Sequence, residues 1–243
     1  MLVVDDGGQF EVVVETEGPS GLGWFPDGRL VISTLGKPHL LVVDGGEVTI
    51  LHDLSELGWS LNDVVVGPNG RIYVDVYRSR EANQTPSGIV VATEDRWRIV
   101  AHDLATPNGL VITPDGSTLI VSDTFSGKIH AFTITDDGGL ADQRVFADLG
   151  ADRRPEGICL DAEGALRVGS FETSEFLRVR EGGEITHRIK TPGRWAIATA
   201  LGGADRPAGW TPRRDRPDRD GLQAFDQGSD REDQAPVADQ VVR

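Results

Sequence analysis

Four polar residues recur along the chain at nearly constant intervals, and each directly precedes a glycine or an aspartate. They are Ser20, Asn62, Asn108 and Glu156, separated by 42, 46 and 48 residues. Each side chain carries an oxygen atom, and amide and carboxylate oxygens suit a hard or borderline divalent cation. If the fold gathers these side chains, the sequence predicts a metal site. Asparagine before Gly or Asp is also ordinary turn chemistry, and that interpretation stays open for each asparagine taken alone.

The four residues belong to a repeat of the whole sequence. A turn glycine recurs with the same three intervals, at Gly28, Gly70, Gly116 and Gly164. Each unit contains a short apolar strand, this turn and a second strand of period two, a pattern typical of a β-hairpin. A second hairpin follows in each unit, and no segment of ten or more residues has a helical period. Four strands in 40 to 50 residues predict the blade of a β-propeller.

Rotational equivalence of the blades determines where the recurring residues lie. Blades related by rotation place equivalent residues at equal distances from one axis. We therefore expect the four side chains to meet at one mouth of a central tunnel. This placement needs only the repeat, and it turns residues that are far apart in the sequence into one candidate site.

The two ends of the chain do not fit the repeat. Residues 1–18 resemble only the outer hairpin of a blade, and 194–201 could begin another inner strand. From Asp205 onward the chain has seven arginines, nine acidic residues and four prolines, with few apolar residues in a strand pattern. Such a segment buries too little apolar surface to offset its ordering cost. The sequence thus predicts a propeller domain at 1–204 and a disordered or aberrant tail at 205–243.

Composition narrows the class of partner. The formal net charge of −15 disfavours nucleic acid and anionic membrane surfaces. The single cysteine, Cys159, excludes an intramolecular disulfide, and no apolar stretch is long enough to span a bilayer. The N-terminal residues lack the pattern of a signal peptide, so we expect a cytoplasmic protein.

The motifs around the four residues resemble a known family. The runs Pro19-Ser20-Gly21-Leu22, Leu61-Asn62-Asp63, Pro107-Asn108-Gly109-Leu110 and Pro155-Glu156-Gly157-Ile158 are similar to those of the gluconolactonase and senescence-marker-protein (regucalcin) family. This resemblance covers about residues 1–204 and implies an all-β, six-bladed propeller, here incomplete, with four full blades plus partial blades. It also implies one divalent cation on the axis (Ca, Zn, Mn, Mg or Fe) and hydrolysis of a sugar lactone.

Roles follow from the resemblance position by position. Asn108 matches a metal ligand, and Glu156 matches an aspartate that binds metal and serves as the general base. Asn62 matches a residue that contacts substrate, and Ser20, at the equivalent place one blade earlier, is expected beside the substrate as well.

Three departures from the family pattern bear on these roles. Glu156 replaces the usual aspartate, and a carboxylate misplaced by about 1 Å can cost on the order of 100-fold in rate. The family's Glu-Gly-Pro ligand motif has no counterpart in the expected blade, although Glu17-Gly18-Pro19 imitates it about one blade too close to Asn62. The tail does not continue the strands, and a late reading start with a frame change near residue 205 would explain both ends.

Two functions from different classes are therefore open. The first is metal-dependent hydrolysis of a sugar lactone with Glu156 as the general base, at an activity that truncation of the chain would impair. The alternative is a propeller that binds or acts as a scaffold without catalysis and has lost its metal site, since an incomplete ring leaves strand edges exposed.

Overall fold

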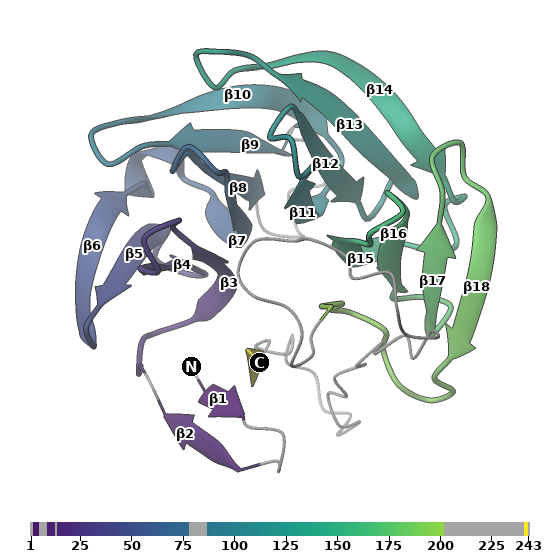
Figure 1. Ribbon diagram of the computed structural model, residues 1–243, viewed down its shortest axis with the longest axis horizontal. Helices are drawn as coiled ribbons and strands as arrows, with labels where there is room; N and C mark the ends of the chain where they lie inside the picture. The colour runs from purple at the N-terminus through teal and green to yellow at the C-terminus, as the bar shows by residue number, and fades with distance from the viewer. Residues whose placement is uncertain (1, 5–8, 13, 78–86, 202–240, 243) are drawn as a thin grey trace.

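Four antiparallel sheets, each built from four strands that are consecutive in the sequence, fan around a common centre (Figure 1). The computed structural model describes residues 2–4, 9–12, 14–77, 87–201 and 241–242. The first sheet comprises β3 (Pro19–Trp24), β4 (Leu30–Thr34), β5 (His39–Asp44) and β6 (Glu47–Asp53). The second comprises β7 (Ser60–Val66), β8 (Ile72–Tyr77), β9 (Ser87–Ala92) and β10 (Trp97–Leu104).

The other two sheets repeat this order. The third comprises β11 (Pro107–Ile112), β12 (Thr118–Asp123), β13 (Lys128–Ile134) and β14 (Leu140–Asp148). The fourth comprises β15 (Pro155–Leu160), β16 (Leu166–Ser170), β17 (Glu175–Val179) and β18 (Ile185–Lys190). A 3₁₀ turn, η1 (Ser55–Leu57), connects the first two sheets, and the described residues contain no α-helix. The predicted all-β propeller with four full blades is confirmed.

The apolar layers between blades hold the fan together. Strand β4 is buried along its whole length because both of its faces are covered. Val31 packs with Val74 and Val90 of the second blade, whereas its neighbour Ile32 belongs to a separate cluster with Leu41 and other residues of the first blade. Successive strand residues point to opposite faces, so a strand between two layers reads as a continuous apolar run.

The chain ends bear on the predicted boundaries. Strands β1 (Leu2–Val4) and β2 (Phe10–Val12) form the expected antiparallel hairpin. A short strand, β19 (Val241–Val242), pairs with β1 in parallel. The structure describes only these two residues of the predicted tail, so the prediction of a disordered segment at 205–243 otherwise lies outside the described residues. Within the part of the chain that is described, no helix has the length and apolar character needed to cross a membrane.

Candidate active site

Each inner strand contains a β-bulge at the position of a recurring polar residue. The register shifts between Pro19 and Leu22 in β3, and at the corresponding positions of β7, β11 and β15. Ser20, Asn62, Asn108 and Glu156 each lie inside their bulge. Since a bulge re-aims the side chains of its strand and is common beside functional sites, the four side chains share one local geometry.

The inner strands are neighbours in space in the order β3, β7, β11, β15. A Cβ atom added at Gly21 would lie 2.5 Å from the backbone nitrogen of Val64, and one at Gly109 would lie 2.6 Å from that of Ile158. Only glycine allows backbones to approach so closely. The glycine that follows each recurring residue in these two strands therefore brings the next inner strand, and its own polar residue, alongside.

The structure joins the four residues in two contacting pairs. The Ser20 hydroxyl donates to Asn62 Oδ1 at 3.0 Å, and Asn108 Nδ2 donates to Glu156 Oε2 at 2.7 Å. Ser20 is buried, whereas the other three side chains are half-buried. Each pair links neighbouring blades, so polar atoms of separate repeats meet within each pair. That all four side chains gather at one mouth of a tunnel stays a prediction.

Two serines of the second strands fix the backbone of this site. Ser33 of β4 donates to the backbone oxygen of Asn62, and Ser122 of β12 donates to that of Glu156 at 2.6 Å. Ser33 Oγ also accepts from the Gly21 N–H at 2.8 Å. The serines hold the recurring residue of the next blade in place, and the sequence analysis missed them because it considered inner strands only.

A further equivalent position follows the fourth blade. Gly157 donates its N–H to the Ile197 oxygen at 2.8 Å. A Cβ at Gly157 would approach the backbone oxygen of Ile197, the Cα of Ala198 and the nitrogen of Thr199. One at Gly109 approaches the same three kinds of atom, in Glu156, Gly157 and Ile158. Ile197 therefore corresponds to Glu156, and this position carries an apolar side chain.

Glu17 and Asp123 each have partners other than the residues of the two pairs. Glu17 is exposed, and its carboxylate pairs with Lys37 at 3.0 Å. Asp123 accepts the N–H groups of Ala105 and Thr106 at 3.1 and 2.6 Å, which is a turn-capping role. Burial would raise the pKa of Asp123, but hydrogen bonds from His130 and from these backbone groups lower it below its ordinary value.

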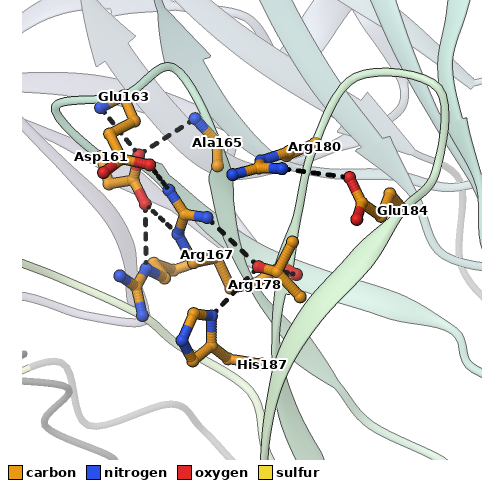
Figure 2. Close-up of polar contacts among 9 residues, drawn as sticks. Asp161, Glu163, Ala165, Arg167, Arg178, Arg180, Glu184 and His187 are labelled. Carbon is orange, nitrogen blue, oxygen red and sulfur yellow. Dashed lines mark hydrogen bonds and ion pairs between the residues drawn. The ribbon is translucent and has the colours of Figure 1, made fainter.

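Strand β15, which carries Glu156, continues into a charged network in the fourth blade (Figure 2). Asp161 follows β15 and accepts from Arg178 Nε at 2.7 Å and from Arg167 Nε at 3.3 Å. Its other oxygen accepts the N–H groups of Glu163 and Ala165, both at 3.0 Å. The network fixes the turn after β15 to β16 and β17.

The donor chemistry of the pair Asn108 and Glu156 fits a hard divalent cation, which prefers amide and carboxylate oxygens. Asn108 Oδ1 accepts the Gly109 N–H at 2.9 Å, so the amide is oriented by its own strand. Among the described residues, no three or more His, Cys, Asp or Glu side chains cluster in a way that could hold a metal. The described site offers one carboxylate and amide oxygens, fewer ligands than a hard divalent cation takes.

The amino-acid sequence matches a known protein family. The model of the SMP-30/Gluconolactonase/LRE-like region matches residues 1–208. The chain belongs to this family. A 6-deoxy-6-sulfogluconolactonase of Pseudomonas putida is 28% identical over 149 residues, covering 59% of this chain and 50% of that protein. Lactonase drp35 of Staphylococcus saprophyticus is 24% identical over 194 residues, covering 73% and 58%.

Solved structures agree with this assignment. The gluconolactonase XC5397 of Xanthomonas campestris superposes with a TM-score of 0.69 at 26% identity, covering 82% of this chain and 71% of that chain. Regucalcin of Agrobacterium tumefaciens, a calcium-binding protein, gives 0.70 at 23% identity, covering 82% and 69%, and at that identity it shows the fold alone. The chain spans about half to two thirds of the length of the curated relatives that it matches.

Proposed function

We propose that the chain hydrolyses a sugar lactone with the help of a divalent cation. The observation that carries the proposal is the contact of 2.7 Å between Asn108 Nδ2 and Glu156 Oε2, which brings an amide and a carboxylate of different blades together. The names of the relatives support the same substrate class, since the 6-deoxy-6-sulfogluconolactonase and the gluconolactonase act on sugar lactones.

The chain's own residues divide the work in this proposal. A cation held by Asn108 and Glu156 supplies Lewis acidity at the lactone carbonyl oxygen. Glu156 takes a proton from the water that attacks the carbonyl carbon, and the ring C–O bond then breaks as the released oxygen is protonated. Asn62 and Ser20 bind the sugar hydroxyls, because an amide and a hydroxyl can each both donate and accept.

The test is hydrolysis of an aldonolactone by the full chain, followed as acid release, with and without a chelator. We expect the protein-catalysed rate to be lost with chelator and to return when a divalent cation is added. Glu156→Gln should lower kcat by about 100-fold or more, the usual contribution of a general base. Glu181→Gln is the matched control, since Glu181 is an exposed carboxylate of the same blade that pairs with Arg144.

Two results would overturn the proposal. One is a rate that chelator leaves unchanged, and the other is a Glu156→Gln variant as active as Glu181→Gln. A chain that binds a lactone in calorimetry but does not hydrolyse it at any cation concentration would instead support the non-catalytic alternative.

A further inference from the structure

One buried carboxyl close to the site has no role in the proposed reaction. Asp75 of β8 is 0% exposed, and neither of its carboxyl oxygens makes a hydrogen bond of ordinary geometry. Burying an ionisable group without full hydrogen bonding is costly. A carboxyl that the fold keeps in such a place needs an explanation.

Asp75 occupies the position that serine occupies in the two neighbouring blades. Strand pairing aligns Ile32 of β4, Val74 of β8 and Val121 of β12 with equivalent inner-strand residues. The next residue in each strand is Ser33, Asp75 and Ser122, respectively. Since β8 packs against β11 as β4 packs against β7, Asp75 faces the same interblade region as the serines.

An ionised aspartate cannot repeat the serine contact. Ser33 and Ser122 donate a hydrogen bond to a backbone oxygen of the next blade, and a carboxylate has no hydrogen to donate. The raised pKa of Asp75 favours the protonated form, and in that form too one carboxyl oxygen remains an acceptor for N–H groups. Asp75 lies opposite the bulge that holds Asn62 and Asp63, and the Asn62 side chain and the Asp63 N–H are the groups that lower its pKa.

The electrostatics of Asp75 agree with this environment. Burial is the largest influence on its pKa, and together with the negative charge of Asp63 it raises that pKa well above the ordinary value. The Asp63 N–H and the Asn62 side chain act in the opposite direction and lower it. Both groups therefore lie close enough to interact with the carboxyl group from its own blade.

We propose that Asp75 is a positioning residue that orients the Asn62 carboxamide from behind the site. Asn62 Oδ1 accepts from Ser20. Asp75 lies opposite the bulge that holds Asn62 and Asp63, and in this proposal its carboxyl group orients Asn62 Nδ2. A carboxamide held at both ends cannot flip. It presents one free lone pair and one free N–H, the combination that suits a sugar hydroxyl, which donates and accepts at once.

This inference rests on the proposed function, because it gives Asn62 a substrate to hold. The first measurement is the lactone hydrolysis rate of the full chain carrying Asp75→Ser or Asp75→Asn. Serine is the residue that the neighbouring blades have at this position, so it should fit the space. Its side chain is shorter than that of aspartate and should not reach the Asn62 amide. We expect Asp75→Ser to raise KM about tenfold with a smaller change in kcat, because an Asn62 amide that is no longer oriented loses about one hydrogen bond to the substrate. Asp75→Asn keeps an acceptor oxygen and should restore KM to within about twofold.

The second measurement does not need activity. The side-chain NH₂ signals of Asn62 in a ¹H–¹⁵N spectrum, assigned by their loss in Asn62→Ser, report whether the amide is held. Asp75→Ser should speed their hydrogen exchange about tenfold, while Asp75→Asn should leave it near the wild-type rate. Asp123→Asn is the control, because Asp123 is a buried aspartate of the neighbouring blade that caps a turn.

The two measurements separate the failure of each proposal. If no variant and no wild-type protein hydrolyses the lactone, but Asp75→Ser still frees the Asn62 amide, the reaction is wrong and the positioning is right. If the Asn62 signals do not change in Asp75→Ser, or change equally in Asp123→Asn, the positioning role is overturned whatever the kinetics show.

Discussion

Asp161 in the fourth blade and Asp75 in the second are both aspartates enclosed by protein, yet the fold treats them in opposite ways. The Asp161 side chain is 10% exposed and is met by two arginines and two backbone N–H groups (Figure 2). Burial alone would raise its pKa, but the hydrogen bonds from Arg178, Ala165 and Glu163 lower it below the ordinary value. Among the residues that the structure describes, no cation pairs with Asp75, and its pKa is raised.

The difference shows that, when two carboxyl groups are both enclosed by protein, their hydrogen-bond partners decide in which direction the pKa shifts. Four donors on Asp161 fix a turn to its sheet, which is a structural task. Asp75 lies beside Asn62, and a second carboxylate, Asp63, adds repulsion. Proteins depart from full polar satisfaction mostly at functional sites, so the comparison itself separates scaffold from site.

The largest effect should come from removing the charge of Asp161, the carboxyl group that has a full set of hydrogen-bond donors. Asp161→Asn removes the negative charge between Arg167 and Arg178 and should lower the free energy of unfolding by about 3 kcal/mol, since a buried cation that loses its partner is strongly destabilising. Urea denaturation followed by tryptophan fluorescence measures this loss. Glu163→Gln is the control, because Glu163 contacts the same Arg178 at 2.8 Å but its side chain is 72% exposed. Equal losses in the two variants would show that burial of the network does not matter.

An intermediate effect should appear in the dependence of stability on pH. Asp75 has a folded-state pKa above its ordinary value of 3.8. Its contribution to the free energy of unfolding is therefore greatest below that pH and is lost as the pH rises toward the folded-state pKa. Asp161 has a lowered folded-state pKa, so its contribution is present above pH 3.8 and is lost as the pH falls below it. Asp75→Ser should therefore flatten the decline above pH 3.8, and Asp161→Asn should flatten the loss on the acid side.

Urea midpoints measured from pH 3 to pH 8 test both signs. A profile in which Asp75→Ser changes only the acid side would contradict the assignment of a raised pKa. A profile in which both variants change the same side would remove the contrast between the two aspartates.

The repeat made the fold accessible from the sequence alone. The turn glycines and the period-two strands recur in every blade, so the four sheets and the placement of Asn108 beside Glu156 follow from local patterns. The hairpin β1–β2 was accessible for the same reason. What a repeat makes visible is the feature that all blades share.

Features that differ between blades were not accessible in this way. Asp75 lies where the first and third blades have Ser33 and Ser122, and its significance depends on burial and on the groups beside it, which no spacing reveals. The β-bulges are also invisible in the sequence, because an extra residue in one strand is recognised only from its pairing with the partner strand. The Asp161 network joins the turn after β15 to β16 and β17 through side-chain contacts, although in the sequence each of its charged residues resembles an ordinary surface residue.

The smallest effect should come from an ion pair at the rim of the same blade. Arg180 and Glu184 pair at 3.2 Å across the turn between β17 and β18, and both side chains are more than half exposed. Exposed ion pairs contribute little to the free energy of unfolding, because water screens the two charges and two long side chains lose conformational freedom. Arg180→Ala should change the urea midpoint hardly at all, in contrast to Asp161→Asn in the same blade (Figure 2). If Arg180→Ala were as destabilising as Asp161→Asn, charge number rather than enclosure would govern this blade, and the contrast between Asp161 and Asp75 would lose its physical basis.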